Sequence, residues 1–365
     1  MAAAPMGRRR DDVRLMPSYV PEHDLDFPYL RRFGPPPREL FARLVAGRIS
    51  RIDESRMLLV PSENAWNEAD CVADYYTEFA RVRSRVLGRR TVLEVWTSDR
   101  EWLERAELVE PVEPPRSWGA LSPERLRLWR LREAVYARAA GGQCTNFRPS
   151  FVKCFLEWCG RWRFKSTELR VLDPCAGWGD RLVGSIAAGV AAYTAVDPNP
   201  MVHEGYRHLL LGGEVFSATQ RGGAILVRAP GAAPVEVDVH ETPFESFDAR
   251  GRRFHVVLTS PPFGTREIYW APGSASQAEQ MKGPDDEASW ASWWYGAWLL
   301  PALSRMASML EDRGVLALYA ADCRCLPGFC ETVARHLQDV EQLSLLAVLQ
   351  CGRLHRKPLW VYGRP

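Results

Sequence analysis

The stretch that decides the fold is Val171-Leu-Asp-Pro-Cys-Ala-Gly-Trp-Gly-Asp-Arg-Leu-Val-Gly184. Its first residues form an apolar run that predicts a buried strand, and Arg181 to Ala188 form an amphipathic segment that predicts a helix. Between them, Gly177 and Gly179 lack a Cβ, so the backbone of this turn can approach a ligand closely. Ordinary strand-to-helix turns also contain glycine, and the full dinucleotide fingerprint has a third one. The role of the turn must therefore be inferred together with the rest of the chain.

A second strand and an acidic residue follow the glycine turn. Ala192 to Val196 is predicted to be a strand that ends in Asp197, about twenty residues after the turn. In a doubly wound α/β sheet, an acid at this place accepts hydrogen bonds from the two hydroxyls of a ribose. Asp before proline is also common in turns, so Asp197 taken alone leaves both interpretations open.

The most informative motif is Ser260-Pro-Pro-Phe263, which follows the apolar strand Phe254 to Thr259. Two consecutive prolines remove two backbone donors and hold the chain extended, so the loop presents carbonyl acceptors. The Ser260 hydroxyl and the Pro261 carbonyl can accept both N–H bonds of an exocyclic amine, which favours the geometry for attack on a methyl group. Phe263 can stack on the plane of a base. A stiff turn without catalytic function is the alternative.

These motifs resemble those of the S-adenosylmethionine (SAM)-dependent amino-methyltransferases, especially the DNA cytosine-N4 and adenine-N6 enzymes. Asp173-Pro-Cys-Ala-Gly-Trp-Gly179 matches their cofactor motif, Asp197 the ribose-binding acid, and Ser260-Pro-Pro-Phe263 the catalytic loop. Thr145-Asn-Phe-Arg-Pro149 is similar to the segment that precedes the first strand. The resemblance covers residues 140 to 365. It implies an α/β, Rossmann-like class I methyltransferase with a mostly parallel seven-stranded sheet.

The resemblance also implies roles for individual residues. Asp173 would meet the methionine amino group of SAM, and Asp197 would bind the ribose. Serine at the head of the catalytic loop is more typical of cytosine-N4 enzymes, whereas Asp or Asn is more typical of adenine-N6 enzymes. The implied cofactor-binding residues are Phe147, Asp173, Cys175, Gly177, Gly179, Asp197, Phe244 and Glu245, and the implied catalytic residues are Ser260, Pro261, Pro262 and Phe263.

Substrate recognition is expected from residues 1 to 140 or from the loop Gly264 to Ala288, because two strands and their connections fill the interval between the motifs. On this loop, Glu267, Tyr269 and Trp270 are candidate substrate contacts that could lie near a flipped base. The alternative is that the loop carries no substrate contacts.

A predicted helix from Ala69 to Leu87 carries aromatic residues followed by arginines. Arg81 and Arg85 are candidate nucleic-acid contacts, because basic residues near aromatics suit backbone contact and base stacking. Alternatively, the aromatics belong to the core and the arginines form the solvated face.

The composition indicates a folded protein without strong general attraction to nucleic acid. The chain has 365 residues, 46% of them hydrophobic, and a net charge of +2. Nine cysteines, with no signal peptide and no apolar run near eighteen residues, favour a reducing intracellular compartment, cytoplasm or nucleus. Cys323, Cys325 and Cys330 lack a fourth ligand at suitable spacing, so we expect thiols and no zinc.

We expect three parts along the chain: a mobile basic arm at 1–25, a smaller N-terminal α+β module at 26–120, and the methyltransferase domain at 121–365. Thr91 to Trp96 is predicted to be a short strand, and Ser122 is predicted to cap a helix through Arg138. A further helix from Ser289 to Leu310 has a tryptophan stripe that we expect to pack against the sheet, formed by Trp290, Trp293, Trp294 and Trp298.

The sequence therefore predicts a SAM-dependent N-methyltransferase that acts on an exocyclic amino group of a nucleobase, with DNA cytosine N4 or adenine N6 preferred. An RNA base amine, such as guanine N2, and a protein glutamine are the alternative acceptors. A methyltransferase-like nucleic-acid-binding or scaffold subunit without turnover is the alternative from another class. The presence of both motifs with Asp197 argues against loss of turnover.

Overall fold

The computed structural model describes most of the chain, and the fold is given for that part. The described residues are 26–47, 49–53, 58–61, 69–86, 89–99, 102, 112–115, 118–139, 144, 146–262, 267–269, 287–322, 326–350 and 357–364. The expected arm at 1–25 lies outside this part, as do Phe263, Trp270, Cys323 and Cys325. None of the described helices has the length and hydropathy needed to cross a membrane.

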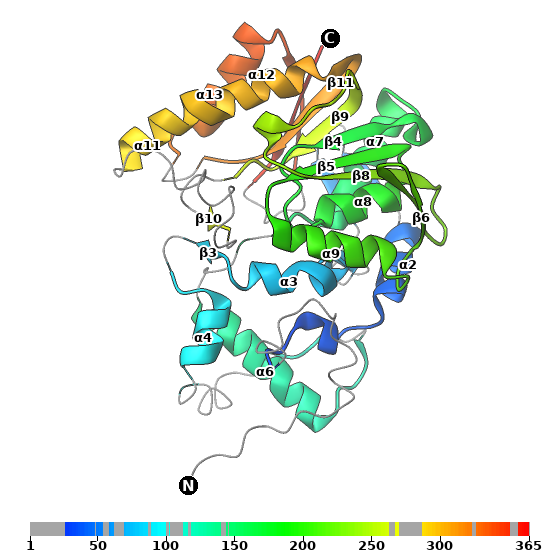
Figure 1. The fold of residues 1–365 in the computed structure, drawn as a ribbon, viewed down its shortest axis with the longest axis vertical. Coiled ribbons are helices and arrows are strands. Elements are labelled where there is room, and N and C mark those ends of the chain that lie inside the picture. The colour runs from blue at the N-terminus through cyan, green and yellow to red at the C-terminus, as the bar shows by residue number, and fades with distance from the viewer. Residues whose placement is uncertain are drawn as a thin grey trace.

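A large sheet forms the centre of the molecule (Figure 1). Its strand order is β12-β13-β11-β9-β4-β5-β8-β7-β6, and the five strands from β11 to β8 run parallel. The predicted α/β fold with a parallel sheet is confirmed. The strands are β4 Arg170–Asp173, β5 Ala192–Asp197, β6 Ser217–Arg221, β7 Ala224–Arg228, β8 Val235–Glu241, β9 Phe254–Thr259, β11 Leu310–Tyr319, β12 Ser344–Leu349 and β13 Leu359–Gly363.

The described part of this sheet has nine strands, whereas the sequence predicts seven. The hairpin of β6 and β7 adds two antiparallel strands beyond β8. β6 was missed because its residues are mostly exposed and show no apolar alternation. At the other edge, β12 and β13 pair antiparallel, so the predicted terminal hairpin is confirmed.

Helices cover both faces of the sheet. Successive residues of the central strands are apolar and point to opposite faces, so each face needs a covering layer. Val171 and Val256 belong to one core, and their neighbours Leu172 and Val257 belong to the other. The first face carries α7 Pro149–Trp162, α8 Asp180–Ala188 and α9 Pro200–Leu211. The second carries α11 Glu287–Trp294, the π-helical turn η8 Tyr295–Leu299, α12 Leu300–Ser308, α13 Phe329–Arg335 and the π-helical turn η9 His336–Val340.

The N-terminal segments pack on the first face and share its core (Figure 1). Helix α3 lies against α9 so closely that a Cβ at Gly205 would be 2.5 Å from the Tyr76 carbonyl oxygen. The described N-terminal elements are η2 Leu30–Arg32, α2 Pro37–Ala46, β1 Ile49–Asp53, β2 Leu58–Pro61, η3 Ala69–Cys71, α3 Asp74–Arg81, β3 Arg85–Val86, α4 Val92–Ser98 and α6 Pro123–Arg138. Helices and strands therefore both occur in this region.

Two predictions for the N-terminal region are wrong. Thr91 to Trp96 is not a strand, because Thr91 and Glu94 form a reciprocal capping box that begins helix α4. The helix predicted over Ala69 to Leu87 is shorter and ends at Arg81. The predicted cap at Ser122 is confirmed, since its Oγ accepts a hydrogen bond from the Arg125 N–H.

Candidate active site

The glycine turn connects β4 to α8, and Tyr206 of helix α9 packs against it. Gly177 and Gly179 have φ values of +61° and +87°, the left-handed region that favours glycine. A Cβ at Gly179 would lie 3.1 Å from the Tyr206 ring, whereas a Cβ at Gly177 would meet no atom closer than 3.7 Å. The Tyr206 hydroxyl donates to the Gly177 carbonyl. Gly179 thus serves packing, and Gly177 borders open space.

Asp197 lies at the end of β5 beside this turn, and its carboxylate is oriented by the backbone. Oδ2 accepts from the Gly177 N–H at 2.7 Å, and Oδ1 accepts from the Asn199 N–H at 2.9 Å. Burial raises the pKa of Asp197, while these two backbone donors lower it in part. Each carboxylate oxygen can accept a further hydrogen bond, as binding a diol requires.

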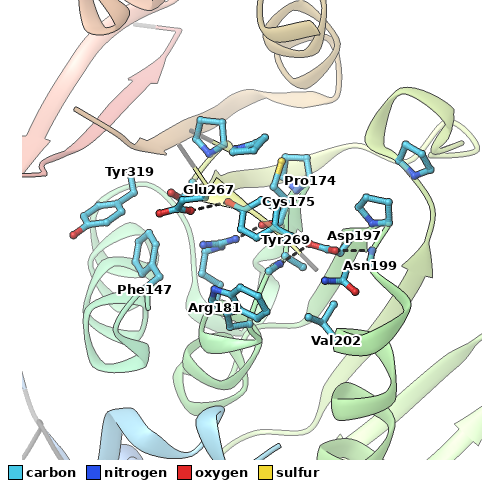
Figure 2. A pocket seen from close by; sticks show the side chains of 18 of the residues that line it. Phe147, Pro174, Cys175, Arg181, Asp197, Asn199, Val202, Glu267, Tyr269 and Tyr319 are labelled. Carbon is cyan, nitrogen blue, oxygen red and sulfur yellow. Dashed lines mark hydrogen bonds between the residues drawn. The ribbon is translucent and has the colours of Figure 1, made fainter. Parts of the chain in front are cut away.

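A cavity of about 270 Å³ lies over this edge of the sheet and brings the two motifs together. Figure 2 shows Phe147, Cys175, Asp197, Glu267 and Tyr269 around it. The residues that the sequence predicts and that line the cavity are Phe147, Cys175, Gly177, Asp197, Glu245, Ser260, Pro261, Pro262, Glu267 and Tyr269. Because parallel strands end at the same edge, loops distant in sequence meet there.

The Ser260-Pro261-Pro262 segment directly follows β9 and forms part of the cavity wall. Pro261 is buried, and Ser260 and Pro262 are half-buried. Strand β9 is hydrogen-bonded to β4, which leads into the glycine turn. The cavity is therefore bordered by the glycine turn and by the proline-rich loop.

Asp173 does not line the cavity, in contrast to its predicted contact with the cofactor. Its side chain is fully buried, and Oδ2 accepts from Arg181 Nε at 2.7 Å and from the Tyr193 hydroxyl at 2.6 Å. Arg181 in turn lines the cavity, with its guanidinium 5.3 Å from the Phe147 ring centroid. The Asp173 carboxylate thus holds Arg181 in place.

Phe244 is also outside the cavity lining. Its side chain is 2% exposed, lies 5.5 Å from the Arg305 guanidinium and stacks on Phe247 at 6.4 Å. It packs under helix α12, whereas its neighbour Glu245 borders the cavity. Phe244 is thus not among the residues that line the cavity, and its predicted contact with the cofactor stays a prediction.

The burial of Arg81 argues against its predicted role as a nucleic-acid contact, whereas the role of Arg85 stays a prediction. Arg81 is 5% exposed, and its guanidinium donates to Asp74 Oδ1 at 2.7 Å. Arg85 forms an ion pair with Glu94. Neither arginine lines the cavity. The aromatics preceding them are buried, as the alternative interpretation expects, but Arg81 is buried with them.

The segment with Glu267 and Tyr269 is tied to the N-terminal region. Strand β10, Glu267–Ile268, pairs antiparallel with β3. The Tyr269 hydroxyl donates to Glu267 Oε2 at 2.8 Å, and its ring lies edge-on to Trp178 at 5.9 Å. Glu267 is only 9% exposed. An acidic side chain is thus held in the cavity wall by the N-terminal region.

The tryptophan stripe has a second role that the sequence analysis missed. Trp294 is buried in the core of the second face, as predicted, and Trp293 and Trp298 pack against that core. All three also line the cavity. Trp294 and Trp298 stack at 5.3 Å with an interplanar angle of 23°. The π-helical turn η8 follows Trp294, a feature often found near functional sites.

Other cavity residues also escaped sequence reasoning. Some of them lie within the quoted motifs, at 145–149 and 171–184, but no spacing rule assigns their side chains a role. They include Asn146, Trp178, Asp180, Arg181, Tyr319 and Lys357.

No protein-family model matches this sequence, and no curated protein matches it. Among solved structures, the magnesium protoporphyrin IX methyltransferase ChlM of Synechocystis PCC 6803 with bound SAM has a TM-score of 0.37 and 12% identity, over 74% of this chain and 94% of that chain. The ribosomal protein L11 methylase of Lactobacillus delbrueckii subsp. bulgaricus has a TM-score of 0.36 and 12% identity, and the match covers 60% of this chain and 80% of that chain. The 16S rRNA N2 G1207 methyltransferase RsmC of T. thermophilus, in complex with AdoMet and guanosine, has a TM-score of 0.33 and 13% identity. That match covers 62% of this chain and 45% of that chain. Similarity this low does not establish an activity, which must be inferred from the site.

Proposed function

We propose that the protein is a SAM-dependent methyltransferase that acts on an exocyclic amino group of a nucleobase. One observation carries the proposal. Asp197, from the end of β5, and Ser260-Pro261-Pro262, from the end of β9, line the same cavity. A diol-binding acid and an amine-binding loop around one space are what methyl transfer from a nucleoside cofactor to an amine requires.

The cofactor side of the cavity has groups that fit SAM. Asp197 would accept hydrogen bonds from the ribose hydroxyls, since two backbone N–H groups already orient its carboxylate. Gly177 leaves the space that a Cβ would otherwise occupy, so a ligand can approach the backbone. Phe147 would pack on the methionine side, beside Tyr319 at 4.5 Å between ring centroids. When bound, SAM supplies an electrophilic methyl group.

On the acceptor side, the chain positions an amine and needs no strong base. The Ser260 hydroxyl and the Pro261 carbonyl would accept the two N–H bonds of the amine, so its lone pair is directed toward the methyl donor. The proton on nitrogen becomes acidic only after methylation. Catalysis then rests on orientation and on preorganised acceptors.

The aromatic wall supports a planar acceptor. Trp293, Trp294 and Trp298 border the same cavity as the catalytic loop, and stacking on aromatic side chains is a general way to hold an extruded base. DNA cytosine N4 or adenine N6 is the proposed target, because the cofactor and catalytic motifs resemble those of these enzymes, and the serine at the head of the loop is more typical of the cytosine-N4 enzymes. An RNA base amine or a protein glutamine is a distinct outcome of the test below.

The test is a tritiated methyl-transfer assay on DNA, RNA and protein pools, followed by mass spectrometry of the labelled nucleosides. Ser260→Ala removes one acceptor and should lower the rate by roughly 10²-fold or more. Pro261→Ala keeps the carbonyl acceptor but loosens the backbone that orients it, so it should lower the rate by less. Ser217→Ala, on the exposed strand β6, is the matched control. Wild-type rates in both loop variants would refute the catalytic role of the loop. Failure of the wild-type protein to bind SAM would favour the scaffold alternative.

A further inference from the structure

Asp180 is a buried carboxylate at the cavity that the proposed mechanism does not yet use. It is the first residue of helix α8, directly after Gly179, and its side chain is 2% exposed. It lines the cavity, and its Oδ1 atom is buried without a hydrogen-bond partner among the described residues. Buried polar atoms are nearly always satisfied, so an unpartnered carboxylate oxygen beside a cavity indicates a ligand donor.

Asn146 provides a second acceptor in the same region. Its Nδ2 donates to Asp74 Oδ1 at 2.7 Å, and Asp74 is an acceptor when ionised, which fixes the orientation of the amide. The Asn146 Oδ1 atom is buried and has no partner among the described residues, although the residue lines the cavity. Asp180 lies within electrostatic reach of the same Asp74. Both residues with an unsatisfied oxygen therefore line the cavity, and both lie near Asp74.

The two arginines that lie near Asp180 are paired with other carboxylates. Arg81 is paired with Asp74 at 2.7 Å, and Arg181 is paired with Asp173 at 2.7 Å. Burial and the Asp74 charge raise the pKa of Asp180, and the two arginines offset this only in part. A ligand ammonium would supply a positive charge beside the Asp180 carboxylate.

We propose that Asp180, together with Asn146, binds the amino group of the methionine moiety of SAM. The inference rests on the proposed function and names the group that holds the charged end of the cofactor. An ammonium has three N–H donors and no acceptor, and it complements one carboxylate and one amide oxygen. Asp173, to which the sequence assigned this contact, is occupied by Arg181 and Tyr193.

The test is calorimetry on the full-length protein with two ligands that share a nucleoside. S-adenosylhomocysteine carries the amino acid moiety, whereas 5′-methylthioadenosine lacks it. Asp180→Asn keeps the shape and removes the charge, so it should weaken S-adenosylhomocysteine binding roughly ten- to hundredfold and leave 5′-methylthioadenosine binding unchanged. Unchanged binding of both ligands, or equal weakening of both, would overturn the proposal.

Asn146→Ala provides an independent variant in case Asp180→Asn does not fold. This variant should bind S-adenosylhomocysteine several-fold more weakly than wild type and bind 5′-methylthioadenosine with unchanged affinity. An S-adenosylhomocysteine analogue without the amino group should bind wild type and Asp180→Asn equally, because the coupling between the amine and the carboxylate is then absent. A remaining difference with this analogue would overturn the assignment. If wild type bound neither nucleoside ligand, the proposed function itself would fail.

Discussion

The Thr77 hydroxyl of helix α3 donates to the carbonyl oxygen of Trp178, in the middle of the glycine turn, at 2.8 Å. Thr77 is fully buried, and its Oγ1 is also 3.0 Å from the Ala73 carbonyl oxygen. A residue 101 positions earlier in the chain thus holds the backbone of the turn that borders the candidate cofactor site. The N-terminal region therefore forms part of the support for the site.

Thr77→Val should loosen the glycine turn while preserving the shape of the side chain. Because the buried Trp178 carbonyl would lose its donor, we expect a loss of about 1–3 kcal/mol in the free energy of unfolding. SAM affinity should fall with it, measured by calorimetry beside denaturant unfolding. Thr97→Val on helix α4 is the matched control, since the Thr97 hydroxyl is exposed and bonds only within its helix. Equal changes in unfolding free energy and SAM affinity in the two variants would contradict the role of Thr77 in holding the glycine turn.

Gly205→Ala should separate helices α3 and α9. The added Cβ would lie 2.5 Å from the Tyr76 carbonyl oxygen and 2.8 Å from Thr77 Cγ2, and backbone atoms cannot move aside cheaply. Overpacking of this kind costs about 1–3 kcal/mol of stability. Gly223→Ala is the control, since a Cβ there meets nothing within 4 Å. Thermal unfolding of both variants decides the point: a midpoint for Gly205→Ala at or above that of Gly223→Ala would show that the helices are not in close contact.

The sheet could be predicted from the sequence because its pattern is local. Val171 and Leu172, like Val256 and Val257, belong to short apolar runs bounded by turn residues, which is the pattern of a strand buried on both faces. Helix α4 was mispredicted because β-branched residues outweighed a capping box that the sequence also contains, Thr91 with Glu94 three positions later.

The site could be predicted only in part, for a physical reason. Asp197 and Ser260 follow parallel strands, so the strand order alone brings them to one edge. The partners of Asp173 depend on tertiary contacts with Arg181 and Tyr193, which no spacing rule provides. The roles assigned to the residues that line the cavity remain predictions.

The Asp70 carboxyl should make stability depend on pH. It accepts from the Ser150 N–H at 2.8 Å and from the Ser150 hydroxyl at 3.0 Å, and burial raises its pKa from 3.8 to about 6. Between these values the folded protein binds a proton that the unfolded chain has lost, so stability falls as pH rises through this window.

Asp70→Asn should remove this contribution. The free energy of unfolding of the variant, relative to that of wild type, should therefore increase by roughly 2 kcal/mol between pH 4 and pH 7. Ser150→Ala removes the hydroxyl donor and keeps the backbone N–H, so one of the two hydrogen bonds that lower the Asp70 pKa is lost and the fall in stability should extend to higher pH in that variant. Denaturant unfolding at a series of pH values measures both, and a constant difference between Asp70→Asn and wild type would exclude the effect.

Trp298→Ala should weaken binding of the acceptor without changing binding of the cofactor. Trp298 borders the cavity and stacks on Trp294 at 5.3 Å, so its loss removes part of the aromatic wall proposed to hold a planar base. Stacking on one aromatic side chain contributes about 1–3 kcal/mol per base, so the acceptor KM should rise roughly 5- to 150-fold. Trp162→Ala is the matched control, because Trp162 is 41% exposed at the end of helix α7 and does not line the cavity. Weaker SAM binding with an unchanged acceptor KM would assign the wall to the cofactor instead.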